Sequence, residues 1–159
     1  MKRGTREADA ERDLGVLYRE HGDRLWRSVW MSTGRPEVAD DAVAEAFAQA
    51  IERGEQLRDP LAWIWRTAFR IAAGEMKTMR ATSPLLADPP EPPMPSLVEL
   101  TRSLARLSDR QRAALILADY AGYPHREIAA ILGTSVSAVA VHVHRARRRM
   151  RTLLEEDDG

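Results

Sequence analysis

Six of the nine prolines in this 159-residue chain fall within residues 81–96, ATSPLLADPPEPPMPS. Proline has no amide hydrogen to donate to a helix or a sheet, and this segment contains few side chains that could pack in a core. Its composition is typical of an extended, semi-rigid linker with polyproline character. We therefore expect two folded modules, residues 1–80 and residues 97–154, joined by a linker at 81–96 and followed by an acidic tail at 155–159.

Apolar residues recur at helical spacing in both modules, and no segment has the alternation of a strand. In the N-terminal module we expect helices over residues 14–34, 36–54 and 60–76, the third one capped by Asp59 and opened by Pro60. The expected fold is therefore all-α, with two small helical domains. The expected core positions of the first domain are Leu14, Leu17, Tyr18, His21, Leu25, Val29, Val38, Val43, Ala46, Phe47, Ile51, Leu61, Ile64, Trp65, Ala68, Ala72 and Met76.

A second stripe on the helix of residues 60–76 combines an aromatic ring with cations: Trp63, Arg66, Arg70 and Lys77. Such a combination can stack an unpaired base and bind its backbone phosphates. The pattern alone favours the simpler interpretation, in which Trp63 belongs to the core and the arginines form a solvated face.

The C-terminal module has the signals of four helices and of a helix-turn-helix. Leucines at helical spacing mark a short first helix, and Ser108 with Gln111 forms a capping box that opens the second. Residues 124–132 form the third helix, which Gly133 ends because glycine enters the left-handed conformation without strain. Ser135 is then the expected N-cap of the fourth helix.

The fourth helix has one apolar face and one polar, basic face. The apolar face, expected to be buried, contains Val136, Val139, Ala140, Val143, Ala146 and Met150. The opposite face contains Ser137, Ala138, Val141, His142, Arg145, Arg148 and Arg149. This arrangement fits a recognition helix in the major groove of DNA. A plain packed helical hairpin, whose terminal arginines only complement the helix dipole, is the alternative.

The charge distribution confines the basic character to the C-terminal module. The whole chain has no net charge, whereas residues 97–151 carry ten arginines and four acidic residues, a net charge of +6. There is no cysteine, no membrane-length apolar run and no apolar signal core at the N-terminus, so we expect a cytoplasmic protein without membrane insertion. We find no catalytic, cofactor-binding or metal-binding pattern and expect no small-molecule substrate.

Taken together, these motifs resemble the RNA polymerase sigma factors of the extracytoplasmic-function (ECF) class, in the sigma-70 family. In the N-terminal module, Leu17-Tyr18, residues 40–47 (DDAVAEAF) and residues 59–64 (DPLAWI) look like region 2 of that family. In the C-terminal module, residues 107–112 (LSDRQR), 127–133 (EIAAILG) and 144–147 (HRAR) look like region 4. The resemblance covers about residues 14–151, and it is specific in the order and spacing of the motifs around one linker.

The resemblance implies two partners, core RNA polymerase and promoter DNA. It implies polymerase binding by Asp40, Asp41, Glu45 and Phe47, and it implies that region 4 binds the upstream −35 element as a duplex. It further implies that the loop of residues 52–58, with Arg58, and the helix from Pro60 read and open the −10 element, so Trp63, Arg66 and Arg70 become candidates for melted DNA. An anti-sigma factor is a further possible partner.

The chain departs from the family pattern at its DNA-reading positions. Pro124 replaces the usual Ser or Thr cap of the first helix of the motif, and the recognition helix begins with valine, serine and alanine where polar and basic residues are usual. Our main hypothesis is a sigma factor that directs promoter-specific transcription and is not itself an enzyme. The alternative is a sigma-like regulator that binds DNA alone, or an adaptor that binds polymerase or another partner, without initiating transcription.

Overall fold

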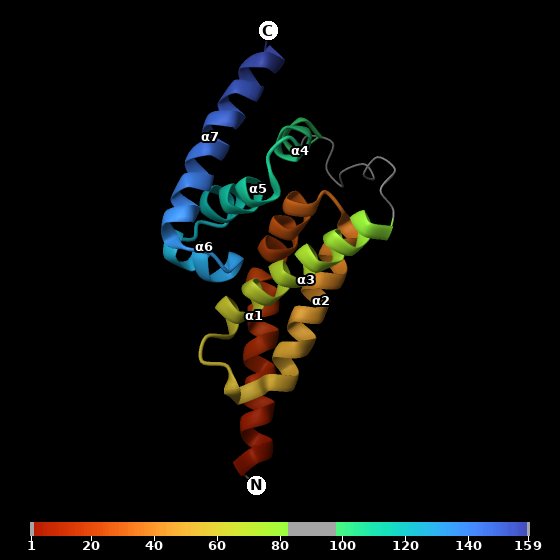
Figure 1. The fold of residues 1–159 in the computed structure, drawn as a ribbon. Helices are drawn as coiled ribbons and strands as arrows, with labels where there is room; N and C mark the ends of the chain where they lie inside the picture. The colour runs from red at the N-terminus through yellow and green to blue at the C-terminus, as the bar shows by residue number, and fades with distance from the viewer. Residues whose placement is uncertain (1, 83–97, 159) are drawn as a thin grey trace.

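The computed structural model describes residues 2–82 and 98–158, and all regular structure in these two ranges is helical. The N-terminal range contains α1 (Lys2–Thr33), α2 (Pro36–Arg53), a short 3-10 turn η1 (Gly54–Gln56) and α3 (Pro60–Thr82). The C-terminal range contains α4 (Val98–Ala105), α5 (Asp109–Leu115), a π-helical turn η3 (Ile116–Tyr120), α6 (His125–Leu132) and α7 (Val136–Asp158). The all-α prediction is confirmed. Figure 1 shows the start of α1 and the end of α7 at opposite ends of the molecule.

Local chemistry sets most helix ends in the N-terminal half. Gly34 and Gly54 adopt positive φ angles of 71° and 51° after α1 and α2, a conformation that favours glycine. Asp59 accepts a hydrogen bond from the amide of Ala62 at 3.1 Å and so caps α3. The expected bounds of α2 and the start of α3 are therefore confirmed. By contrast, α1 begins at Lys2 rather than near Leu14. Hydrophobic periodicity could not predict these first turns, because they are largely exposed and carry no apolar stripe.

The buried seam of α2 is lined with alanine. Four alanines have no exposed surface, namely Ala39, Ala42, Ala46 and Ala50, and they let α1 and α3 approach α2 closely. Two expected core residues lie beside this seam and are exposed: Ile51 is 50% exposed and Tyr18 57%. Their prediction as core residues was wrong, since the stripe of large side chains does not coincide with the axis of burial.

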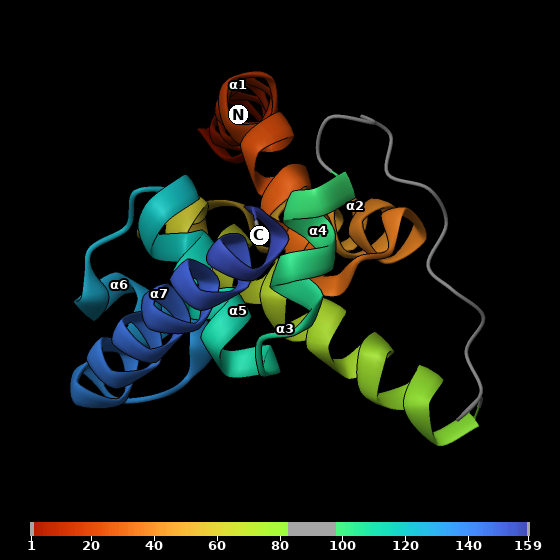
Figure 2. The same cartoon turned by 90° about the horizontal axis from the view of Figure 1, so that it is seen from above.

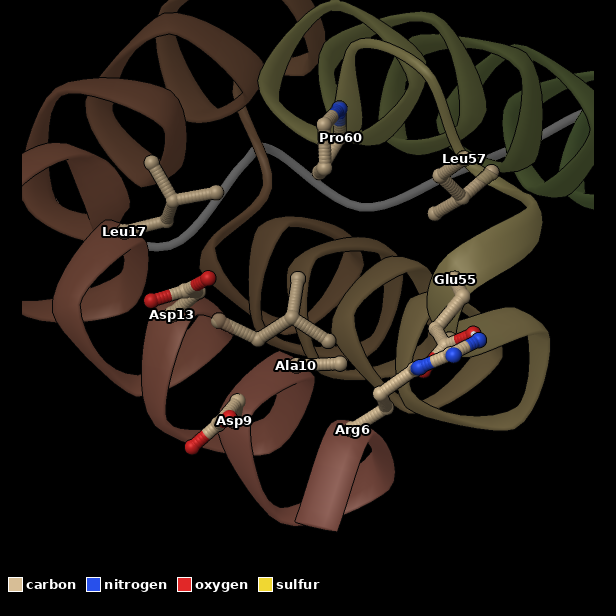
Figure 3. A pocket seen from close by; sticks show the side chains of 10 residues that line it. Arg6, Asp9, Ala10, Asp13, Leu17, Glu55, Leu57 and Pro60 are labelled. Atoms are coloured by element: carbon tan, nitrogen blue, oxygen red, sulfur yellow. Dashed lines mark ion pairs between the residues drawn. The ribbon is translucent and has the colours of Figure 1, made fainter. Parts of the chain in front are cut away.

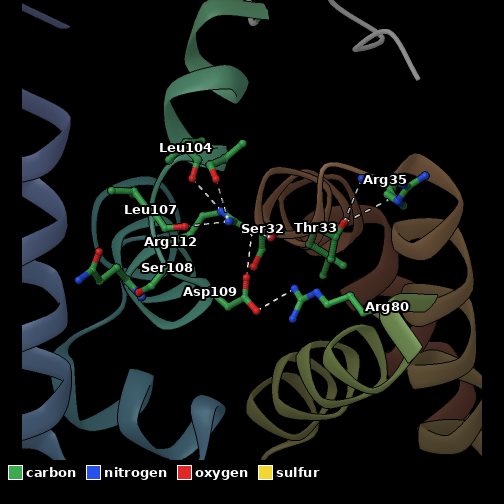
Figure 4. Close-up of polar contacts among 12 residues, drawn as sticks. Ser32, Thr33, Arg35, Arg80, Leu104, Leu107, Ser108, Asp109 and Arg112 are labelled. Atoms are coloured by element: carbon green, nitrogen blue, oxygen red, sulfur yellow. Dashed lines mark hydrogen bonds and ion pairs between the residues drawn. The ribbon is translucent and has the colours of Figure 1, made fainter. Parts of the chain in front are cut away.

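The two halves of the chain share one core. The ring of Trp65 on α3 meets the edge of Tyr123, which precedes α6, with centroids 5.0 Å apart and planes at 69°. Arg112 on α5 donates a hydrogen bond to the carbonyl of Ser32 at the end of α1, at 2.9 Å, and Arg80 pairs with Asp109 at 2.8 Å (Figure 4). Seen from above, α2 and α6 pack against different sides of α3 (Figure 2).

Within residues 2–82 and 98–158, no single helix is long and apolar enough to cross a membrane. The pair α6 and α7 meets that length and composition test only when joined across a 101° bend. This bend belongs to the helix-turn-helix described next.

Candidate nucleic-acid interface

The turn between α6 and α7 has the backbone geometry that its sequence predicts. Gly133 lies in the left-handed region with φ 66° and ψ 43°, and the amide of Thr134 donates to the carbonyl of Ala129 at 3.0 Å. Ser135 then accepts a hydrogen bond from the amide of Ala138 at 3.1 Å, which caps α7. The two helix axes differ in direction by 101°, within the range of helix-turn-helix motifs.

One side of α7 anchors the helix to the core. Val139 and Ala146 have no exposed surface, and Val143 is 1% exposed, so this stripe packs as expected. Val136 and Ala140 were also expected to be buried, but Val136 is 50% exposed and Ala140 is exposed. Both lie in the first two turns of α7, three residues before the buried Val139 and Val143.

The opposite side of α7, here called the outer side, contains the seven residues expected to face DNA. Five of them are exposed: Ser137, Val141, Arg145, Arg148 and Arg149. Ala138 and His142 are partly buried. The Nδ1 atom of His142 is enclosed and has no hydrogen-bond partner among the described residues, so that nitrogen is turned away from solvent. The outer side is therefore apolar near the start of α7 and basic farther along.

A fourth arginine of α7, Arg147, forms an ion pair with another helix at the protein surface. Arg147 donates two hydrogen bonds to the carboxylate of Asp119 in η3, at 2.6 and 3.2 Å. These bonds and the charge of Asp119 raise the pKa of Arg147 above its usual value. Because Arg147 fastens α7 to η3, its role differs from that of the arginines on the outer side.

The second candidate surface, here called the α2–α3 edge, combines Arg58, Trp63, Arg66 and Arg70 with a residue that sequence reasoning missed. The guanidinium of Arg53, the last residue of α2, lies over the Trp63 ring, with Cζ 5.1 Å from the ring centroid. Trp63 itself is partly buried against the core, while Arg58, Arg66 and Arg70 are exposed. Trp63 thus contributes to the core, and its binding of an unpaired base stays a prediction. Arg53 escaped prediction because it belongs to a different helix, so no periodicity relates it to Trp63.

A cavity of about 270 Å³ lies between the first turns of α1 and the turn that precedes α3 (Figure 3). Arg6 on α1 approaches Glu55 across it at 4.0 Å. The other polar side chains of its lining are Asp9 and Asp13. The cavity is therefore of mixed charge and adjoins the loop of residues 52–58.

The third surface, here called the acidic side of α2, carries Asp40, Asp41 and Glu45, which are all exposed. Asp40 accepts a hydrogen bond from Nε1 of Trp26 at 2.7 Å. Burial raises the pKa of Glu75 on α3, and the nearby charge of Asp41 raises it further.

Phe47 was expected to belong to the same polymerase-binding set but is only 7% exposed. Tyr18 lies against its ring in a T-shaped contact, with centroids 5.1 Å apart. Phe47 thus packs in the core beneath the acidic side of α2, while the three carboxylates lie on the protein surface.

Comparisons with known proteins find relatives that match both halves of the chain. The family described as Sigma-70, region 4 matches residues 97–150. The ECF RNA polymerase sigma factor SigL of Mycobacterium tuberculosis strain H37Rv is 29% identical, over 98% of this chain and 97% of SigL. SigM of the same strain is 30% identical, over 87% of this chain and 75% of SigM. The fold is similar to that of the sigma factor RpoE in a co-crystal structure with the anti-sigma factor NepR from Bartonella quintana, with a TM-score of 0.78 and 21% identity, over 92% of this chain and 97% of that one.

Proposed function

Because the chain belongs to the ECF RNA polymerase sigma factors, we propose that it directs core RNA polymerase to promoters through the three surfaces described above. The outer side of α7 binds the −35 element as duplex DNA, the α2–α3 edge binds the melted −10 element, and the acidic side of α2 binds the polymerase. The chain performs no covalent step, since catalysis belongs to the polymerase. It acts in the cytoplasm, together with the polymerase and its DNA.

The single observation that carries this proposal is the exposure of the outer side of α7. The helix-turn-helix anchors α7 through Val139 and Val143 while leaving Arg145, Arg148 and Arg149 exposed on other sides. Arginines at these positions can neutralise backbone phosphates, which provides the sequence-independent part of DNA binding. The net charge of +6 on residues 97–151 supports the same role.

The α2–α3 edge has the composition of a single-strand binding surface. Arg66 and Arg70 are exposed on α3, one turn apart, and can contact phosphates. Trp63 offers the ring on which an unpaired base can stack, and Arg53 lies over that ring at 5.1 Å. On this assignment Arg53 either moves aside when a base stacks on Trp63 or stays as the cation on its other face.

The acidic side of α2 supports the third assignment. Asp41 and Glu45 are exposed on a helix whose other side is firmly packed, so their position is fixed by the alanine seam. Fixed carboxylates suit a basic partner surface, because complementary charges speed association and select the partner. The prediction of an anti-sigma factor as a further partner stays a prediction.

Run-off transcription with purified core polymerase and fragments of the source genome tests the proposal. We expect discrete transcripts that depend on this protein. Asp41→Asn should weaken binding to core polymerase by about tenfold and reduce the transcripts at limiting protein, as expected for one lost charge contact in an interface. The variant should fold normally, since Asp41 is exposed and removing its charge relieves a repulsion that adds to the effect of burial on the pKa of Glu75.

The matched control is Asp23→Asn on α1, where the Asp23 side chain is 89% exposed. It should leave both binding and transcription unchanged. A protein that binds promoter fragments alone and is indifferent to Asp41→Asn would instead be the free-standing regulator. A protein that binds core polymerase but yields no transcripts would be the adaptor.

A further inference from the structure

The first two turns of α7 present an aliphatic side chain at the centre of the outer side. Residues at i, i+4 and i+11 lie along one line of a helix, and here they are Ser137, Val141 and Arg148. Val141 is 44% exposed, whereas Val139 and Val143 on the same helix are 0% and 1% exposed. Val136 is 50% exposed but lies toward the buried stripe, so among the seven residues of the outer side Val141 is the one aliphatic side chain larger than alanine.

Hydrogen-bonding groups are scarce around it. The Ser137 hydroxyl lies 3.2 Å from that of Ser135, which already accepts the amide of Ala138 as the helix cap. His142 is partly buried with its Nδ1 enclosed. The neighbours of Val141 toward the start of the helix, Ala138 and Ala140, have only methyl groups. Since the N-terminal residues of a recognition helix are those that meet base edges, this part of α7 has little capacity to read bases by hydrogen bonds.

The major groove has one apolar feature that an aliphatic side chain can recognise, the C5-methyl group of thymine. Against any other base edge, a valine would remove water from a donor or acceptor without replacing the hydrogen bond. We propose that Val141, flanked by Ala138, reads a thymine methyl group in the −35 element, so that this element contains at least one thymine whose methyl group determines recognition.

The occupant of this apolar face is duplex DNA rather than a protein, for two reasons. The face continues directly into Arg145 and Arg148, whose charge is complementary to phosphates. It also lies at the start of the second helix of a helix-turn-helix within the segment matching sigma-70 region 4. The inference rests on the proposed function, because it specifies how the −35 surface reads sequence.

The test replaces each thymine of the −35 element, on either strand, by deoxyuridine, which removes only the methyl group and keeps all hydrogen-bonding groups. The holoenzyme formed with this protein then transcribes the substituted promoters in competition with the unmodified one. We expect one position, or two adjacent ones, at which uracil weakens promoter binding by about fourfold, the change that corresponds to one buried methyl group.

The variant Val141→Ala makes the assignment specific. It should lower binding to the unmodified promoter by a similar factor and be insensitive to uracil at the critical position. It should also fold, since alanine favours helix and Val141 is exposed. Val16→Ala is the matched control, because Val16 is a 39% exposed valine on α1, outside the helix-turn-helix, and it should retain the fourfold sensitivity.

Three results overturn the inference: a −35 element without thymine, wild-type transcription that no uracil substitution alters, or a Val141→Ala variant as sensitive to uracil as the wild type. The last two would be expected if Val141 contacted a protein instead. Failure of the proposed function appears earlier and separately, as an absence of transcripts from the unmodified promoter.

Discussion

Replacing Arg112 by methionine should destabilise the whole protein, because the guanidinium of Arg112 satisfies carbonyl groups from both halves of the chain. It donates to the carbonyl of Leu104 at 2.8 Å, to that of Leu107 at 2.9 Å and to that of Ser32 at 2.9 Å. A longer contact reaches Ala105 at 3.4 Å. Burial lowers the pKa of Arg112, the charge of Asp109 opposes this, and Arg80 adds to the lowering. Figure 4 shows this cluster between the ends of α1 and α4.

The expected loss follows from the three short hydrogen bonds. Methionine retains an apolar stem but leaves three carbonyl groups without their charged donor. Because these carbonyls lie at helix ends and can partly recover water, we assign about 1 kcal/mol to each, near the lower limit for a buried acceptor that loses its partner. The free energy of unfolding should fall by about 3 kcal/mol. With a urea dependence of about 2 kcal/mol per molar, the midpoint should fall by about 1.5 M.

The four tryptophans make the assay specific, since all of them lie in α1 and α3 while Arg112 lies in α5. Tryptophan fluorescence therefore reports the N-terminal half, and circular dichroism reports helix throughout. We expect both midpoints to fall together, because the halves share one core. Arg110→Met, on the same helix at an exposed position, is the control and should change stability by less than about 0.5 kcal/mol. Equal midpoints for the two variants, or a fluorescence midpoint that stays at its wild-type value, would refute the reasoning.

Two further predictions concern single groups at the helix-turn-helix. Burial raises the pKa of Tyr123 to about 12, helped by Glu127 and Asp59 and opposed by Arg24. Because the unfolded chain loses this proton near pH 10, the free energy of unfolding should be unaffected below about pH 10 and fall by about 1 kcal/mol toward pH 12, reduced by solvent screening. Denaturation of wild type and Tyr123→Phe across that range checks this, and parallel curves would contradict it. Gly133→Ala should lower the free energy of unfolding by about 1 kcal/mol, since Gly133 has φ 66°. Gly74→Ala within α3 should instead be neutral or stabilising, so equal losses in urea titrations would speak against the φ argument.

Much of the fold follows from local chemistry that the sequence states directly. The helix bounds were predicted where a residue determines its own backbone geometry. These places are Gly54, Asp59 with Pro60, and the Gly133–Ser135 turn. The start of α1 was not, because exposed polar turns have no periodic signal. Nor was the alanine seam of α2, since a small side chain becomes a core residue only through the helix that packs on it.

The candidate site divides in the same way. Periodicity alone predicted that Ser137, Val141 and Arg145 share the outer side of α7, and the structure leaves all three exposed. It did not predict that Arg53 lies over Trp63, because that contact joins two helices. Contacts between the two halves cannot be predicted from hydrophobic periodicity, because the residues that form them are far apart in the chain. Arg112 and Ser32, for example, are 80 residues apart.

The packing of the two halves limits how much promoter the compact form can contact at once. On the proposed assignment the −35 element lies on α7 and the −10 element on the α2–α3 edge. The positions after which the two elements are named are about 25 base pairs apart, or about 85 Å at about 3.4 Å per base pair. A compact chain of this length has a radius of gyration of about 15 Å, so its two DNA surfaces lie well within that span. Promoter binding by both surfaces therefore requires the halves to separate, which breaks the Trp65–Tyr123 contact and the hydrogen bond from Arg112 to Ser32. The strength of these contacts opposes promoter binding, and the gain from core polymerase and DNA must exceed it.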